Sequence, residues 1–282
     1  MPYNRFVEVR AAVADIARDF AAHRAERLGR RSLEPDDFAR LERAGFLLTG
    51  VPAEQGGLWR GLHESVRDYT ELVRLLAEGD ACVALVAAMH PSVLSFWLSA
   101  ADPQTDPEAW RAQRQRFVDT AKGGHWWGTM ISEPGSGGDI LQTRASAEPD
   151  GAGFALSGDK HFASGSGITS FMITTARVGD ASPDLFVVDM RGREWDGGTG
   201  IKLLAPWNGH GMIATQSHAF TLSRCRAERA ASHEAFASAV PTVSQLTPML
   251  FAAVVIGILR NALDMARERV RARAVGLKAY EQ

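Results

Sequence analysis

The stretch Ile-Ser-Glu-Pro-Gly-Ser-Gly-Gly-Asp, residues 131–139, is followed by Ser-Gly-Asp-Lys-His-Phe-Ala-Ser at residues 157–164. Proline and glycine keep the first stretch out of regular structure and let its backbone approach a ligand closely. Free backbone N–H groups and the Ser132 hydroxyl suit the edge of an isoalloxazine ring, where hydrogen-bond donors and acceptors alternate. Phe162 offers an apolar face, and Ser164, two residues later, shares its side of a regular strand. Each stretch alone is most often an ordinary loop, but the two together have the groups that suit the edge and the face of such a ring.

Composition narrows the class of protein. A chain of 282 residues is long enough for two domains and a substantial core. The formal net charge of -2, from 31 basic and 33 acidic residues, indicates no nucleic-acid or anionic-membrane surface. Cys82 and Cys225 have no CxxC partner, which fits a reducing compartment. The N-terminus has no apolar h-region, and the longest apolar run, 249–259, is shorter than the roughly 20 residues of a bilayer span. We therefore expect a cytoplasmic protein.

Helical periodicity dominates residues 5 to about 101. Val9, Val13, Ile16 and Phe20 recur at helix spacing, and a later helix over 81–89 is predicted to end at His90. From Gly124 the pattern changes to short alternating segments separated by glycine-containing turns. The predicted strands are 143–147, 154–157, 171–177, 185–189, 201–204 and 218–222.

A last helix is predicted from about Thr247, with Thr247 as its cap and Pro248 at the first helical position. Its segment 249–259 is apolar on every face, so it must be surrounded by protein. The chain still reads as helix at Gln282, and we expect it to be part of a longer protein rather than a shortened relative. The fold class is therefore α+β, with a helical domain at 1–123, an all-β domain at 124–230 and the first part of a helical bundle at 231–282.

Several other motifs are missing or have ordinary explanations. There is no Gly-x-Gly-x-x-Gly after a strand, no Walker signature and no Gly-x-Ser-x-Gly. The eight histidines form no metal-binding pair, so no metal site is expected. For Trp127 we favour packing against the sheet over a place beside a cofactor. Arginines at every second position from 267 to 273 scatter around a helix and are predicted to be a solvated helix end.

The paired stretches resemble the two flavin-contacting segments of the acyl-CoA dehydrogenase family, a Thr-Glu-Pro-x-x-Gly-Ser-Asp loop and a Gly-x-Lys-x-aromatic-x-Thr strand. Residues 52–57, Pro-Ala-Glu-Gln-Gly-Gly, resemble the family's Pro-x-x-x-Gly-Gly element. The resemblance covers nearly the whole chain and implies FAD between the β domain and the bundle, in a homotetramer or dimer. The implied flavin contacts are Thr129, Met130, Ile131, Ser132, Gly137, Gly138, Phe162, Ala163 and Ser164.

The same resemblance implies α,β-dehydrogenation of an acyl-CoA thioester, with an electron-transfer flavoprotein as acceptor. Three positions depart from the family. Gly138 replaces a serine that helps to hold the substrate, and Phe162 replaces the usual tryptophan. The family's catalytic glutamate is not found, because no Asp or Glu lies between Glu234 and Asp264. Glu133 belongs to the flavin loop and is not expected to act as the base.

Two alternatives remain open. Monooxygenases and N-oxygenases of the same fold bind reduced flavin, FMN in this case, which a flavin reductase delivers. They need no glutamate, because oxygen activation at the flavin involves no α-proton abstraction. Gly138 and the missing base leave this alternative open. The second alternative is a flavin-binding relative without catalytic activity.

Overall fold

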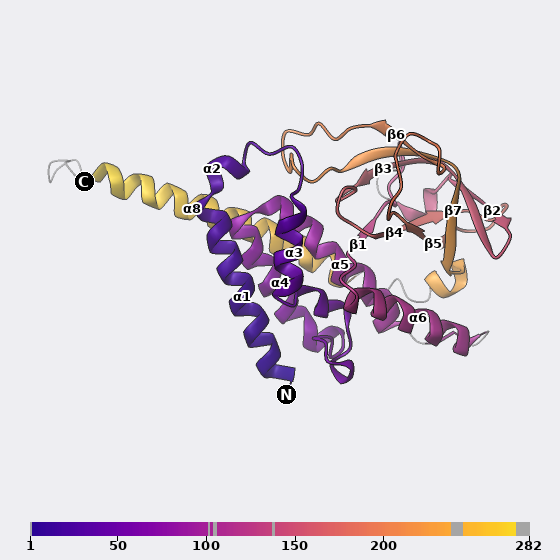
Figure 1. Ribbon diagram of the computed structural model, residues 1–282, viewed down its shortest axis with the longest axis horizontal. Helices are drawn as coiled ribbons and strands as arrows, with labels where there is room; N and C mark the ends of the chain where they lie inside the picture. Colours follow the sequence, from indigo (N-terminus) through magenta and orange to yellow (C-terminus); the bar gives the residue numbers. More distant parts are fainter. Residues whose placement is uncertain (1, 101, 104–105, 137–138, 238–244, 275–282) are drawn as a thin grey trace.

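The computed structural model describes residues 2–100, 102–103, 106–136, 139–237 and 245–274. Helices gather at one end of the molecule and strands at the other, and the last helix extends outward past the helical end (Figure 1). The helices are α1 (Pro2–Ala22), α2 (Arg24–Arg27), α3 (Pro35–Arg43), α4 (Leu62–Gly79), α5 (Ala81–Ser99), α6 (Pro107–Lys122) and α8 (Leu246–Ala274), with 3-10 turns at Phe46–Gly50, Ala53–Gln55 and Ile140–Gln142.

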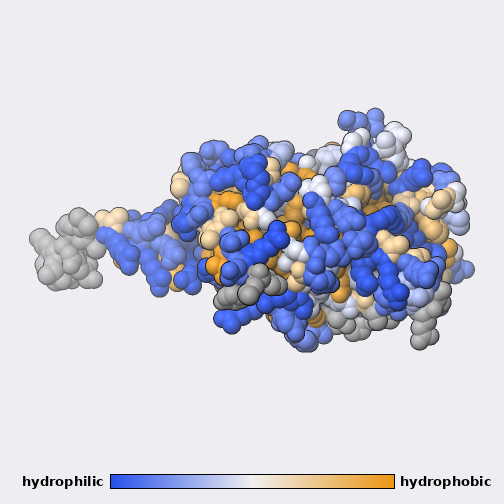
Figure 2. Space-filling view, turned by 60° about the horizontal axis from the view of Figure 1, so that its bottom comes forward, coloured by the Kyte–Doolittle hydropathy of each residue, from blue (hydrophilic) through white to orange (hydrophobic). Residues whose placement is uncertain are grey.

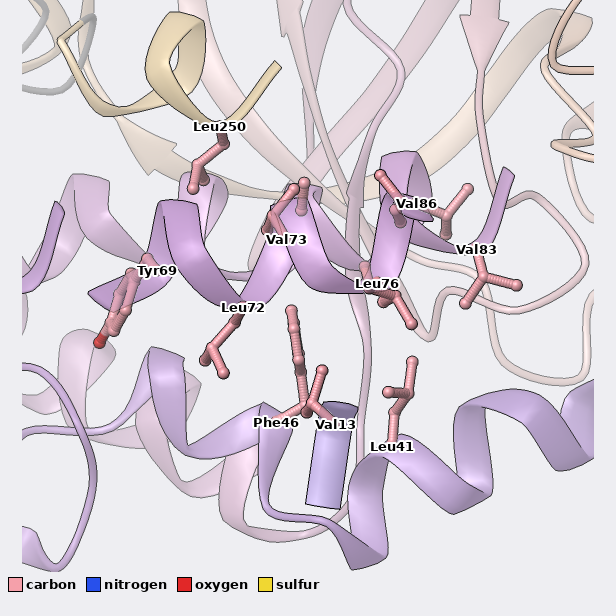
Figure 3. Packing of buried hydrophobic residues seen from close by; sticks show 14 of the residues in the cluster. Val13, Leu41, Phe46, Tyr69, Leu72, Val73, Leu76, Val83, Val86 and Leu250 are labelled. Atoms are coloured by element: carbon pink, nitrogen blue, oxygen red, sulfur yellow. The ribbon is translucent and has the colours of Figure 1, made fainter. Parts of the chain in front are cut away.

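The amphipathic helix α4 organises the helical core. Its buried residues Tyr69, Leu72 and Leu76 face Val13 of α1 and Phe46 (Figure 3). On the opposite side of α4, Leu250 of α8 completes the cluster (Figure 3). The two helices approach closely at Gly257, where an added Cβ would lie 2.5 Å from the Cβ of Ala77. Removal of this apolar surface from water is the main force that holds α1, α4 and α8 together.

Helix α5 is longer than the sequence pattern predicts. The prediction that it ends at His90 is wrong, because α5 continues through Pro91 to Ser99. Its start is fixed by the Asp80 carboxylate, which accepts hydrogen bonds from the backbone N–H groups of Cys82 and Val83. Proline inside a helix costs roughly 3 kcal/mol. Burial of residues 92–97, directly after Pro91, offsets that cost.

The strands form a seven-stranded sheet in the order β1-β4-β5-β7-β3-β2, with β6 paired to β7. Pairing is antiparallel except between β1 and β4. The strands are β1 (Trp127–Thr129), β2 (Ser146–Asp150), β3 (Gly153–Ala163), β4 (Phe171–Ala176), β5 (Asp184–Asp189), β6 (Ile201–Ala205) and β7 (His218–Ala231). The α+β prediction is confirmed. The sequence pattern missed β1, which is too short to show alternation, and placed the start of β2 three residues early, in the segment 143–145 that connects the 3-10 turn Ile140–Gln142 to the strand.

An aromatic cluster joins the sheet to the helices. Trp127 is fully buried, stacks on Phe171 at 5.0 Å between ring centroids and contacts Trp97 of α5 and Phe117 of α6. Its indole Nε1–H donates to the Thr120 hydroxyl at 2.8 Å. The prediction that Trp127 packs against the sheet is therefore confirmed.

Two helices, α5 and the segment Leu246–Arg273 of α8, are long and apolar enough to cross a membrane by length and composition alone. The longest uninterrupted apolar run, 249–259, was too strict a criterion for a membrane span. A window that tolerates single polar residues is longer than that run. Most of the α5 window is buried in the protein core, as expected of a core helix. Most of the α8 window is exposed.

Candidate functional site

Residues 131–136 and 157–164 lie side by side in the structure. The backbone N–H of His161, near the end of β3, donates to the carbonyl oxygen of Ser132 at 2.7 Å. Next along the chain, the Lys160 ammonium donates to the Glu133 carboxylate at 2.6 Å. The loop after β1 is thus attached to β3 by a backbone bond and an ion pair.

Glu133 and Lys160 are both buried, and their polar groups are fully engaged. The Lys160 ammonium also donates to the Thr175 carbonyl at 2.7 Å. The Glu133 carboxylate accepts in addition from the backbone N–H groups of Arg144 at 2.7 Å and Ala145 at 3.2 Å. Burial lowers the pKa of Lys160, and the adjacent Glu133 carboxylate opposes that shift. A carboxylate held by three donors fixes the loop and is not available as a base.

Phe162 is the most unusual residue of the site. Its φ of 55° is in the left-handed region, which costs a bulky residue of order 1–3 kcal/mol. The pairing of β3 with β7 is irregular between Lys160 and Ala163, so the alternation of a regular strand ends here. Phe162 is consequently 56% exposed, whereas Ser164 is 5% exposed, and the two do not share one side of a strand. An exposed aromatic ring on a strained backbone indicates a surface that meets a ligand.

Ser164 begins a chain of buried hydroxyl groups that the sequence did not reveal. Its Oγ lies 2.7 Å from the Oγ of Ser217, which lies 2.7 Å from the Oγ1 of Thr215. Thr215 donates in turn to the carbonyl of Met212 at 2.8 Å. The segment 212–217 is about fifty residues away in sequence and carries no motif, so only the fold brings it to Ser164.

Trp207 comes from the same connection between β6 and β7. Its ring lies edge-to-face with Phe162 at 6.0 Å between centroids, and its Nε1–H donates to the Met212 carbonyl at 2.9 Å. Phe162 and Trp207 therefore form an aromatic pair at the end of β3. The hydrogen bond to Met212 anchors the Trp207 ring to the turn that contains Thr215.

Two of the expected flavin contacts have little to offer a ligand. Met130 is fully buried, its N–H donates to Ile173 and its carbonyl accepts from the Thr174 hydroxyl. We therefore remove Met130 from the site, because its side chain and its backbone are already used by the sheet. Ala163 is also fully buried in the sheet core, which leaves only its backbone for a contact.

The remaining expected contacts differ in accessibility. Ser132 and Ile131 are half-buried, and among the described residues neither the hydroxyl nor the backbone N–H of Ser132 has a hydrogen-bond partner. Thr129, also half-buried, places its hydroxyl 4.0 Å from the sulfur of Met89 in α5. Gly137 and Gly138, including the expected substrate contact at Gly138, lie outside the described residues.

A cavity of about 920 Å³ lies elsewhere, between α6 and the sheet, and includes neither Ser132, Phe162 nor Ser164. Two of its arginines are paired with carboxylates of the same cavity, Arg116 with Glu228 and Arg191 with Asp189. We place the site at Phe162 despite the size of this cavity, because strain, exposure and free donors meet there. In the part of the chain that the structure describes, no group of three or more His, Cys, Asp or Glu is arranged to hold a metal ion.

Comparison with known proteins defines the fold. No family model matches the chain. Dibenzothiophene monooxygenase from Rhodococcus qingshengii is 26% identical over 96% of this chain and 63% of its own length. Methanesulfinate monooxygenase from Pseudomonas fluorescens has a TM-score of 0.70 at 26% identity, over 92% of this chain and 62% of that one. The FMN-bound dibenzothiophene monooxygenase from Paenibacillus sp. A11-2 has a TM-score of 0.72 at 21% identity, over 93% and 65%.

The chain thus has the acyl-CoA dehydrogenase-like fold, and its relatives in that fold are flavin oxidoreductases. It spans less than two thirds of the length of the relatives described above. The prediction of acyl-CoA dehydrogenation is wrong, because these relatives are named as monooxygenases. Glu133, which was not expected to act as the base, is engaged by Lys160.

Proposed function

We propose that this protein is a flavin-dependent monooxygenase that binds reduced FMN and oxygenates a small organosulfur compound. One observation carries the proposal. The exposed Phe162 ring, the free donors of Ser132 and the buried Ser164 hydroxyl lie close to one another, and the neighbouring Glu133 carboxylate is already engaged by Lys160. The names of the relatives at 26% identity, which act on dibenzothiophene and methanesulfinate, support the substrate class. The FMN in the Paenibacillus structure supports FMN over FAD.

The residues of the site fit a flavin. The free N–H and hydroxyl of Ser132 are suited to hydrogen-bond the ring edge, and Phe162 to lie against its face. The Ser164 hydroxyl is suited to meet the reactive edge. Reduced flavin, when bound, supplies the activation of molecular oxygen. No residue has to remove a substrate α-proton in that chemistry, so the engaged state of Glu133 is no obstacle.

A flavin reductase as partner, a cytoplasmic location and a homo-oligomer also belong to the proposal. The oligomer is supported by the apolar side chains that α8 leaves exposed, and hydrophobic patches are visible over the helical part of the molecule (Figure 2). The exposed large apolar residues of α8 are Met249, Phe251, Val255, Ile256, Leu259, Leu263 and Val270. A tetramer or a dimer would bury them.

Isotope labelling tests the oxygenation. Purified protein is supplied with FMN, NADH, a flavin reductase and ¹⁸O₂, and dibenzothiophene and methanesulfinate are offered separately. We expect one ¹⁸O atom in the product of at least one substrate, and none when the reductase is omitted. An acyl-CoA panel is the negative control and should leave bound oxidised FMN unreduced. Product without label, or reduction of FMN by an acyl-CoA, would contradict the proposal.

Truncation of Phe162 should weaken flavin binding. Phe162→Ala removes a ring face worth roughly 0.5–1.5 kcal/mol in an aromatic contact, so the Kd for FMN should rise about two- to thirteenfold. Fluorescence titration of FMN measures the change. Phe162→Trp should retain the affinity, and Leu28→Ala, which truncates an exposed apolar residue at the end of α2, should have no effect. Equal affinities of wild type and Phe162→Ala would remove Phe162 from the site.

A further inference from the structure

The buried hydroxyl chain at Ser164 has a definite direction. A hydroxyl group carries one proton, and a carbonyl oxygen can only accept. Thr215 lies 2.8 Å from the Met212 carbonyl, so the Thr215 proton is donated there. The 2.7 Å contact between Thr215 and Ser217 then requires the proton of Ser217, and the 2.7 Å contact between Ser217 and Ser164 requires the proton of Ser164.

The second acceptor near Ser164 does not change this order. The carbonyl of Phe162 lies 3.5 Å from the Ser164 Oγ, at the limit of a hydrogen bond. If the Ser164 proton pointed there, either the short contact with Ser217 would hold no proton, or the chain would reverse and the 2.8 Å contact of Thr215 with the Met212 carbonyl would hold none. The three hydroxyl groups are 5% (Ser164), 7% (Ser217) and 0% (Thr215) exposed, so their contacts with protein atoms set the order between them. Ser164 is therefore left with free lone pairs and no free proton.

The backbone on both sides of the hydroxyl chain is strained. Four non-glycine residues in the described chain have positive φ, and three of them, Phe162, Met212 and Gln216, flank the hydroxyl chain. The Met212 carbonyl also accepts from Trp207, and the Thr215 carbonyl accepts from the Gly165 N–H at 2.7 Å. Strained residues that several hydrogen bonds hold in place are typical of functional sites.

We propose that the chain Ser164–Ser217–Thr215 makes Ser164 a hydrogen-bond acceptor and so selects reduced flavin over oxidised flavin. This inference rests on the proposed function, which places the reactive edge of the flavin at Ser164. N5 of reduced flavin carries a hydrogen and donates, whereas N5 of oxidised flavin has only a lone pair. An acceptor at Ser164 gains a bond with the reduced form. To serve the oxidised form, the whole chain must reverse and lose the bond from Thr215 to Met212.

Selection of this kind suits an enzyme that receives reduced flavin from a separate reductase. A site that binds the reduced form tightly takes it up, and the same site releases the oxidised form after turnover. The positioning residues are Ser217 and Thr215, which act only through Ser164. A hydroxyl group with a purely structural role would change the Kd of both redox forms of the flavin equally. Ser217 and Thr215 are instead expected to change the two Kd values differently.

The test compares the Kd of oxidised FMN with the Kd of FMN reduced anaerobically, for wild type and Ser217→Ala. Without the Ser217 oxygen, the Ser164 proton is free to turn toward N5 of the oxidised form. We expect the ratio of oxidised to reduced Kd to fall about tenfold, the value of roughly one hydrogen bond. A tenfold fall lowers the midpoint potential of bound FMN by about 30 mV for a two-electron couple.

Two further variants keep the test decisive. Thr215→Val preserves shape but frees the Ser217 proton, and should shift the ratio in the same direction. Thr221→Ala removes a hydroxyl of β7 that donates to Asp159 on the exposed side, and should leave the ratio unchanged. An unchanged ratio in both Ser217→Ala and Thr215→Val, with FMN still bound, would overturn the inference alone. If wild type binds neither form of FMN, the proposed function falls and takes the inference with it.

Discussion

Replacement of Lys160 by methionine is expected to lower the free energy of unfolding by about 3–5 kcal/mol, the usual effect of removing one partner of a buried ion pair. Lys160 is fully buried and is the only charged partner of Glu133 among the described residues. Methionine fills a similar volume, so the loss reports the unpaired Glu133 carboxylate rather than a cavity. Urea denaturation followed by tryptophan fluorescence, without added flavin, measures the change.

Two comparisons separate charge from packing. The double variant Glu133→Gln/Lys160→Met removes both charges and should recover part of the stability, since a buried pair often contributes little net free energy. The ion pair of Arg224 with Glu148 is the matched control, because those side chains are 63% and 69% exposed. Arg224→Met should therefore cost less than about 1 kcal/mol. A similarly small loss for Lys160→Met would mean that water reaches the pair.

The same ion pair shows what the sequence could predict about the site. Residues 131–139 and 157–164 were expected to act together, and the bonds from His161 to Ser132 and from Lys160 to Glu133 bring them together. The α+β class and most strand positions followed from periodicity, because alternation is directly visible in a sequence. The flavin-loop motif could be recognised in the sequence because the residues that contact one another lie within two short segments.

Other features depend on contacts that a sequence pattern does not contain. The reversal of exposure between Phe162 and Ser164 follows from an irregular pairing with β7 and a positive φ, which alternation cannot anticipate. Ser217 and Thr215 reach Ser164 only through the fold. Helix α5 passes Pro91 because its surroundings are buried, a tertiary effect that overrides local propensity. The first interpretation of the chemistry failed because the resemblance identified a fold that several reactions share.

Acidification should destabilise the protein through His90. This residue is fully buried in α5, and its Nε2–H donates to the Leu47 carbonyl at 3.1 Å. Its Nδ1 has no partner among the described residues, and the Trp126 ring lies 5.5 Å away. Burial therefore lowers the pKa of His90 from 6.5 to about 4. A proton on Nδ1 would be a buried charge without an acceptor.

The sign follows from which state binds the proton first. In the unfolded chain His90 becomes protonated below about pH 6.5, whereas in the folded protein it stays neutral until about pH 4. The stabilisation is thus complete above pH 6.5, declines between pH 6.5 and 4, and amounts to roughly 3 kcal/mol at about 1.4 kcal/mol for each pH unit. Denaturant unfolding at a series of pH values measures it.

The variant His90→Gln isolates this contribution, since glutamine can still donate to Leu47 but does not titrate. The free energy of unfolding of wild type minus that of His90→Gln should fall by about 3 kcal/mol between pH 7 and 4. Burial also lowers the pKa of His218, but that contribution is present in both proteins and cancels in the difference. His23→Gln, at an exposed histidine of the helical domain, controls for the loss of a histidine as such. A difference that stays constant with pH would show that folded His90 accepts a proton as readily as the unfolded chain does.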